Sequence, residues 1–206
     1  MTDSQWLSLA LVCLLGAMSP GPSLAMVVRH SLAGGRRAGI VCAFSHAFGI
    51  FLWAAMMVGG LGVLLLSSPD IFFAVRLAGA AFLSYVGLQA IRARPAEAAL
   101  STGTAALGAY AGSPAREGFI IALSNPKVAV FFAALFSQFI SPTAPNAQQW
   151  IIAGTAATID ALWYAVVAVL LTRAAVLQWF QERIGLLNRF FGVILITLSL
   201  SIILTG

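Results

Sequence analysis

The sequence predicts an all-α membrane protein with six transmembrane helices, and its composition and length are the first grounds for this. Of its 206 residues, 61% are hydrophobic and only 8% are charged. A water-soluble domain carries about a quarter of its residues as Asp, Glu, Lys and Arg. A transmembrane helix needs about 20 apolar residues, so this length accommodates six helices with short connections. We therefore expect one integral membrane domain over residues 1–206, without a separate catalytic or regulatory domain.

Each of six apolar segments is expected to form a helix, because a lone strand in lipid leaves its backbone groups without hydrogen-bond partners. Runs such as 58–66 also lack the alternation of a barrel strand. The first segment lacks the basic start and the cleavage signal of a signal peptide, so we expect it to be retained. The segments cover residues 5–29, 39–67, 70–91, 116–140, 149–172 and 186–205.

Two connecting stretches organise the chain. Residues 92–112 are the longest polar stretch, rich in Ala, Gly, Ser and Thr, and they separate two groups of three segments. Residues 174–185 mix Trp179 and Phe180 with Gln, Glu and Arg side chains. This mixture is typical of a short interfacial helix, so we do not expect a seventh span there.

The basic residues predict the orientation of the spans. Nine of the eleven Lys and Arg residues lie in or beside the first, third and fifth connections, whereas Arg76 and Lys127 lie inside segments. By the positive-inside rule, these three connections are expected to be cytoplasmic and both termini external. The nine are Arg29, Arg36, Arg37, Arg92, Arg94, Arg116, Arg173, Arg183 and Arg189.

The two halves, about 1–95 and 113–206, share short sequence matches in the same order. Residues 19–22 correspond to 124–127, residues 52–55 to 162–165, and residues 76–79 to 189–192. Two halves with an odd number of spans insert in opposite senses, which predicts an inverted-topology repeat.

A break is expected in the first and the fourth helix. Ser19, Pro20, Gly21 and Pro22 stand in the middle of the first segment, and Asn125-Pro126 occupies the equivalent place in the fourth. Proline removes a backbone donor and neither proline nor glycine favours a helix interior. Broken backbone in a membrane is tolerated only beside protein or a water-filled cavity. Paired breaks at corresponding positions therefore point to a transporter's binding site, where freed backbone groups hold a substrate's charges.

Two charges lie inside the spans and are candidate substrate ligands. Lys127 follows the second break, and a cation at this depth is expected to face the interior, where it can attract a carboxylate. Asp160 is the only acidic residue well inside any segment. It can hold a substrate ammonium group or a proton, and the alternative is a purely structural ion pair between Lys127 and Asp160. For His46 the sequence favours a hydrogen-bonded structural role, with a proton relay as the alternative. Cys13 and Cys42 are expected to be small hydrophobes without a disulfide.

Several classes of function are not expected. The sequence has no phosphate-binding loop for ATP hydrolysis, no set of metal ligands, no nucleophile with a base, and no aromatic and basic interleaving for nucleic acid. We expect no enzymatic activity, no metal and no cofactor. Any transport by this chain is then secondary or passive.

Motifs along almost the whole chain match a known family. On these motifs the chain resembles the LysE/RhtB family of small bacterial amino-acid exporters, which includes homoserine, threonine, leucine and lysine exporters. The matching residues are 18–22, 34–39, 77–83, 118–119, 125–127, 131–139, Asp160 and 187–192. Two departures concern the substrate: residues 44–50 lack the Gly-Asp or Gly-Gln pair common in the second span, and Ser137 precedes Gln138 where many members have Pro.

The resemblance implies export of amino acids or their derivatives from the cytoplasm across the bacterial inner membrane, driven by proton exchange and compatible with a homodimer. The expected partners are an amino acid, protons and the lipid bilayer. We assign substrate binding to Ser19, Pro20, Gly21, Pro22, Asn125, Pro126, Lys127 and Asp160, with Asp160 also as the proton site. The few intramembrane charges favour a neutral substrate. The alternatives are a cation or metal-ion exporter and a membrane assembly subunit that transports nothing.

Overall fold

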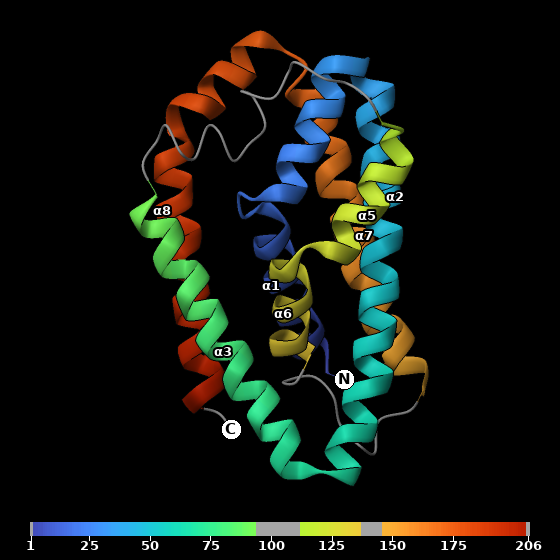
Figure 1. The fold of residues 1–206 in the computed structure, drawn as a ribbon, viewed down its shortest axis with the longest axis vertical. Helices are drawn as coiled ribbons and strands as arrows, with labels where there is room; N and C mark the ends of the chain where they lie inside the picture. The colour runs from blue at the N-terminus through green and yellow to red at the C-terminus, as the bar shows by residue number, and fades with distance from the viewer. Residues whose placement is uncertain (1, 94–111, 137–145, 205–206) are drawn as a thin grey trace.

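The computed structural model describes residues 2–93, 112–136 and 146–204, and within these ranges it is helical without any strand. The all-α prediction is therefore confirmed for this part of the chain. Figure 1 shows the helices packed side by side in an elongated bundle. They are α1 (Asp3–Met18), α2 (Pro22–Ser67), α3 (Pro69–Arg92), α5 (Pro114–Ser124), α6 (Pro126–Phe136), α7 (Asn146–Leu170) and α8 (Ala174–Leu204).

Both expected helix breaks are present. The first segment is divided into α1, which ends at Met18, and α2, which begins at Pro22. The fourth is divided at Asn125 into α5 and α6. Prolines begin α2 and α6, where a missing backbone donor does no harm because the first amides of a helix have no intrahelical acceptor. The proline motifs thus interrupt the first and the fourth predicted segment.

The helix α2 contains the second half of the first span and all of the second. Its dihedral angles leave the helical region at Gly35, where φ is 74°. Figure 1 shows that the chain climbs to one end of the bundle, reverses and descends. A positive φ favours glycine because it has no Cβ to collide with the backbone. The segment bounds 5–29 and 39–67 predict a connection over residues 30–38, but the helix continues to this single glycine. We call residues 22–34 and 36–67 the first and second arms of α2.

Four helices are long and apolar enough to cross a membrane by length and composition: α2, α3, α7 and α8. The interfacial helix expected at residues 174–185 is helical, but it is continuous with the last span. Pairs one turn apart hold it in the helix, with Gln178 Nε2 donating to Glu182 Oε1 at 3.0 Å and Arg183 lying 4.9 Å from the Trp179 ring centroid. Figure 1 shows this part of α8 bending over the end of the bundle.

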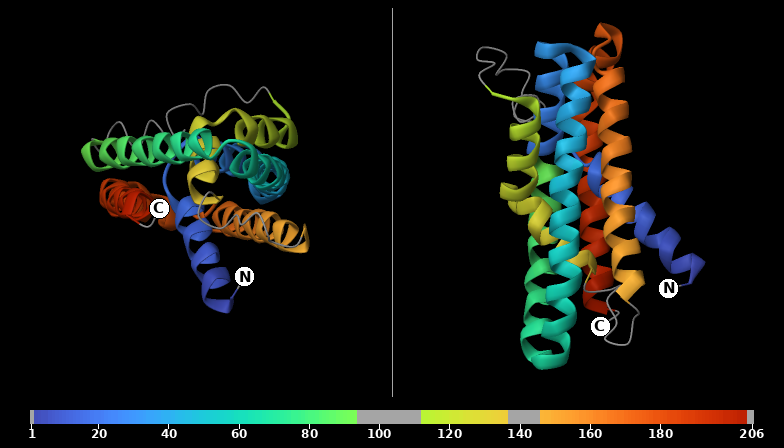
Figure 2. Two further views of the ribbon diagram at one scale, coloured as in Figure 1. Left: turned by 90° about the horizontal axis from the view of Figure 1, so that it is seen from below. Right: turned by 90° about the vertical axis from the view of Figure 1, so that its right-hand side faces the viewer.

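Small residues bring helix pairs into close contact. A Cβ added at Gly87 of α3 would lie 2.7 Å from the Gly192 carbonyl oxygen of α8, and one added at Gly118 of α5 would collide with the Cys42 carbonyl oxygen of α2. Such contacts are typical of helix packing in membranes. By contrast, Figure 2 shows α1 leaning away from the bundle at its N-terminal end. The packing is therefore tight around α5 and open around the start of α1.

Candidate functional site

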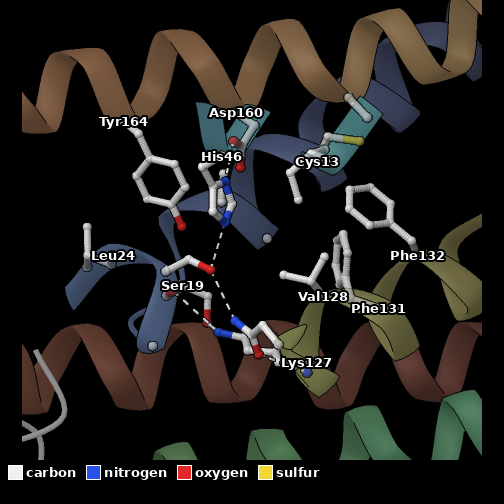
Figure 3. A pocket seen from close by; sticks show the side chains of 17 residues that line it. Cys13, Ser19, Leu24, His46, Lys127, Val128, Phe131, Phe132, Asp160 and Tyr164 are labelled. Carbon is white, nitrogen blue, oxygen red and sulfur yellow. Dashed lines mark hydrogen bonds and ion pairs between the residues drawn. The ribbon is translucent and has the colours of Figure 1, made fainter. Parts of the chain in front are cut away.

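A cavity of about 50 Å³ lies between the two helix breaks. Figure 3 shows its lining side chains, which come from α1, both arms of α2, α6 and α7. Five of the eight expected site residues line it, and these are Ser19, Gly21, Asn125, Lys127 and Asp160. Since one water needs about 10–15 Å³ of such space, the cavity holds a few waters. An amino acid needs more room than this, so the cavity must widen to admit one.

Lys127 lies inside the protein with its ammonium group on the first helix break. Its Nζ donates to Ser19 Oγ at 2.7 Å, to the Pro20 carbonyl oxygen at 3.1 Å and to the Ser19 carbonyl oxygen at 3.3 Å. A lysine ammonium has three hydrogens to donate, so these three acceptors can use all of them. The cation therefore binds the chain's own broken backbone in this conformation.

Asn125 makes hydrogen bonds to both helices that meet at the second break. Its backbone N–H donates to the Ile121 carbonyl oxygen at the end of α5. Its side-chain Oδ1 accepts a hydrogen bond of 3.0 Å from the Lys127 backbone N–H at the start of α6. This contact fixes the orientation of the amide, because the backbone N–H only donates. The Nδ2 group then points to Ser23, to which it donates at 3.0 Å.

Asp160 is buried, and its partner is His46, not Lys127. Its Oδ2 lies 2.7 Å from His46 Nδ1. The imidazole is 1% exposed and its Nε2 lies 2.9 Å from Ser23 Oγ. Tyr164 packs edge-on against the same ring, with 5.1 Å between centroids. Among the described residues, no ion pair joins Lys127 to Asp160, so the structural pair considered from the sequence is absent there.

The polar contacts form one chain across the bundle, from Asp160 through His46 and Ser23 to Asn125. This chain connects α7, both arms of α2 and the break between α5 and α6. In Figure 3 the Asp160 and His46 side chains lie across the cavity from Lys127. The site thus has a cationic end at Lys127 and, when Asp160 is ionised, an anionic end at the Asp160–His46 pair. These two charges complement those of a zwitterion.

The remaining walls of the cavity are apolar. They are formed by Cys13, Leu24, Ile50, Val128, Phe131 and Phe132. The Phe131 ring lies directly on Gly16 of α1, where an added Cβ would be 2.5 Å from Phe131 Cζ. Both cysteines are free, which agrees with their expected role as small hydrophobes.

A second ionic cluster lies outside the cavity, between the first arm of α2 and α5. Glu117 Oε2 accepts from Arg29 and lies 2.8 Å from His30 Nε2. His30 is fully buried, and the Glu117 side chain is 24% exposed. We did not single out these residues in the sequence, because charges at segment ends are common. The cluster stands about two helical turns from the breaks, toward the end of the bundle where α2 reverses (Figure 1).

The described residues hold no group of three or more His, Cys, Asp and Glu side chains that could bind a metal ion. The cavity contributes one carboxylate and one imidazole, which already bind each other. A divalent cation requires more oxygen, nitrogen or thiolate ligands than this pair. Three of the expected site residues shape the breaks without lining the cavity, and these are Pro20, Pro22 and Pro126. The two residues at which the sequence departs from the family in the fourth span, Ser137 and Gln138, lie outside the described residues.

Comparison with known proteins gives the family. The sequence model of the LysE type translocator matches residues 14–206. The chain is 31% identical to the homoserine/homoserine lactone efflux protein of Salmonella typhimurium, over 93% of this chain and 92% of that protein. It is 22% identical to the threonine efflux protein of Escherichia coli K12, over 97% and 98% of the two chains. An uncharacterized membrane protein of Pseudomonas aeruginosa is 30% identical over 88% and 90%. No solved structure matches the chain. The chain therefore belongs to the LysE type translocator family, and it is a membrane transport protein and not an enzyme.

Proposed function

We propose that this protein is a secondary transporter that exports amino acids or their derivatives from the cytoplasm across the bacterial inner membrane in exchange for protons. The observation that carries the proposal is the cavity between the helix breaks, with Lys127 at one end and the Asp160–His46 pair at the other. An α-amino acid carries a carboxylate and an ammonium group, and these two ends complement them. The efflux proteins among its relatives support the same substrate class.

Binding of the substrate begins at the breaks. The substrate carboxylate approaches Lys127 and replaces contacts of its ammonium group with the Ser19 and Pro20 carbonyl oxygens. The substrate ammonium takes the free lone pairs of Asp160 and the released carbonyls. The apolar wall around Phe131 and Phe132 receives the side chain. A charged side chain would be desolvated there without a partner, so the site favours neutral amino acids.

The transport cycle follows from six spans arranged as two inverted three-helix halves, residues 1–95 and 113–206. The substrate is held near the bilayer midplane, and one half rocks against the other. On the arginine-rich side, expected to be cytoplasmic, the Arg29–His30–Glu117 cluster closes the route between the first arm of α2 and α5. On the opposite side, Phe131 closes the route by packing on Gly16. We call these the ionic gate and the aromatic gate.

The test is transport in proteoliposomes. Purified protein is reconstituted into vesicles with an acidic lumen, and the uptake of a panel of labelled amino acids, including homoserine and threonine, is measured. For exchange of one proton per amino acid, each pH unit supports about tenfold accumulation in the lumen. Asp160→Asn should abolish this accumulation, while Glu182→Gln, a carboxylate-to-amide change on an exposed side chain, should preserve it.

Each result has a definite meaning. Accumulation of one or a few amino acids that disappears in Asp160→Asn supports the exporter and identifies its substrate. Undiminished accumulation in Asp160→Asn would refute the role of this carboxylate. If the folded native protein moves no member of the panel, the proposed substrate class is wrong.

A further inference from the structure

We propose that the proton of the exchange is bound by His46 together with Asp160, and that Ser23 transmits the protonation of this pair to both helix breaks. The proposal rests on the proposed function and assigns two residues to it. The sequence favours a structural role for His46 over a relay, and it assigns no role to Ser23.

The contacts of Asn125 and Asp160 determine where their hydrogen-bonding hydrogens lie. Asn125 Oδ1 accepts from a backbone N–H, so its Nδ2 is the group that donates to Ser23 Oγ. An ionised Asp160 only accepts hydrogen bonds, so His46 Nδ1, at 2.7 Å, carries a hydrogen and donates it. With no further proton on the pair, the imidazole is neutral and its Nε2 is an acceptor.

The position of the Ser23 hydroxyl hydrogen follows from these contacts. Its hydroxyl has one hydrogen to donate and already accepts from Asn125. When Nε2 of His46 is an acceptor, the contact of 2.9 Å requires that the serine hydroxyl donates to it. The unprotonated pair therefore fixes the direction of the Ser23 hydroxyl.

A proton added to the His46–Asp160 pair can reside on either residue. If it resides on the imidazole, Nε2 becomes a donor. If it resides on Asp160, the carboxyl donates to Nδ1, and the hydrogen displaced from that nitrogen appears on Nε2. The two arrangements belong to one titrating pair, and in both of them Nε2 carries a hydrogen. Ser23 therefore responds to the protonation of the pair, wherever in the pair the proton resides.

The consequence reaches both breaks. Once Nε2 donates, Ser23 Oγ accepts from His46 as well as from Asn125, and its own hydrogen must turn to another acceptor. Tyr164 lines the same cavity and packs edge-on against the imidazole, and we assign its hydroxyl oxygen as this acceptor. Ser23 is in the first turn of α2 after the first break, and Asn125 is the second break. Protonation thus changes the hydrogen bonding that joins the two interrupted helices.

The charges of the site give the sign of the coupling. The unprotonated pair has a charge of −1 and attracts a substrate ammonium, whereas the protonated pair is neutral and does not. The titratable and charged groups around the imidazole are Asp160 and Tyr164 on α7, Cys13 on α1 and Lys127 on α6. The Lys127 ammonium group donates its hydrogen bonds to the first break, so it does not directly neutralise the charge of the His46–Asp160 pair. Proton and substrate therefore exclude each other, which is the requirement for exchange.

The first experiment separates substrate movement from proton coupling. Labelled homoserine is the probe, with threonine as the second, in proteoliposomes containing the full chain. Exchange is measured at equal pH on both sides, and accumulation is measured with an acidic lumen. In His46→Gln, the amide N–H can donate to Asp160 and the amide oxygen can accept from Ser23, so the variant reproduces the unprotonated arrangement. Because His46 belongs to one end of the binding site, exchange should slow but stay measurable, whereas accumulation should fall from about tenfold per pH unit to none.

Ser23→Ala tests the transmission. This variant leaves the His46–Asp160 pair in place but removes its connection to Asn125. Accumulation should again be lost, while Ser8→Ala, the same change at an exposed serine of α1, should behave as the native protein. Persisting exchange in His46→Gln shows that the variant is folded.

A spectroscopic measurement tests the same inference without transport. The chain has two histidines, so ¹⁵N-labelled imidazoles give few signals, and the His46 signals are those absent in His46→Gln. At high pH they should report the Nδ1–H form, and when the pair takes up a proton a hydrogen should appear on Nε2. The transition should move in Asp160→Asn.

The outcomes are distinguishable from a failure of the proposed function. If His46→Gln accumulates the probes as the native protein does, or if no hydrogen appears on His46 Nε2 when the pH is lowered, the inference is wrong and the exporter remains. If the native protein neither exchanges nor accumulates any amino acid, the proposed function fails and this inference fails with it.

Discussion

The ionic gate gives a prediction whose magnitude can be worked out from its contacts. Glu117 Oε2 accepts from Arg29 and contacts His30, and its side chain is about one quarter exposed. A hydrogen bond to a charged group contributes about 1.5–3 kcal/mol when buried, and a fully exposed ion pair contributes about 0.2–1 kcal/mol. Glu117→Gln removes the charge but keeps an oxygen acceptor. We therefore expect it to favour the open gate by about 1.4 kcal/mol, which is a tenfold change in population.

The two native cysteines provide the assay, because the sequence contains no others. Cys42 is fully buried beneath α5, with its Sγ about 3.1 Å from the position of a Cβ at Gly118. Cys13 lines the cavity next to the aromatic gate. Each cysteine is kept alone by changing the other to Ser, and the rate of maleimide labelling is measured in membranes. Glu117→Gln should increase the labelling rate of Cys42 about tenfold, without increasing that of Cys13.

A matched control separates gating from a general loss of charge. Glu182→Gln makes the same substitution at a 57% exposed carboxylate on α8, and it should leave both labelling rates unchanged. An unchanged Cys42 rate in Glu117→Gln would refute the ionic gate. An equal rise at Cys13 and Cys42 would show that the variant loosens the whole bundle instead of one side.

Two further predictions concern packing and binding. Gly118→Ala places a Cβ against the Cys42 carbonyl oxygen, and it should destabilise the detergent-solubilised protein by about 1–3 kcal/mol in thermal unfolding. The same change at Gly154, where nothing lies within 4 Å, should be neutral or stabilising by about 0.5–1 kcal/mol; equal melting of the two variants would contradict the close α2–α5 contact. Lys127→Met removes the cation of the site and should raise the half-saturating homoserine concentration in exchange about thirtyfold, for a loss of about 2 kcal/mol. A native value in this variant would exclude Lys127 as the carboxylate ligand.

The sequence predicted the features that depend on local chemistry. Pro20, Pro22 and Pro126 each lack a backbone donor that a helix interior requires, so both breaks were expected. Lys127 and Asp160 were conspicuous because a charge inside a span is costly. The gap between segments 5–29 and 39–67 indicated a connection, although only the positive φ of Gly35 shows how short the reversal is.

The partners of the site residues could not be predicted, because they depend on the rotation and depth of each helix. His46 and Asp160 are 114 residues apart, and Asn125 and Ser23 are 102 apart. A single serine in an apolar run gives no signal of its own, since a hydroxyl can also bond to the backbone of its own helix. The ionic gate was missed for a related reason, since Arg29 and Glu117 stand at segment ends, where charges are usual.

The contacts of Lys127 connect substrate binding to movement of the helices. In this conformation the lysine cation joins α6 to the first break, through Ser19 and Pro20. A substrate carboxylate that takes this cation must compete with backbone carbonyls, and each contact it replaces removes a bond between the two halves. Ser23 and Asn125 form the other polar connection between the breaks, and His46 controls its hydrogen positions. In the proposed cycle, substrate and proton therefore act on two separate connections of the same pair of interrupted helices. A transporter that must not open when empty needs such an arrangement, because the resting cavity satisfies its own charges and only a ligand with competing groups can release them.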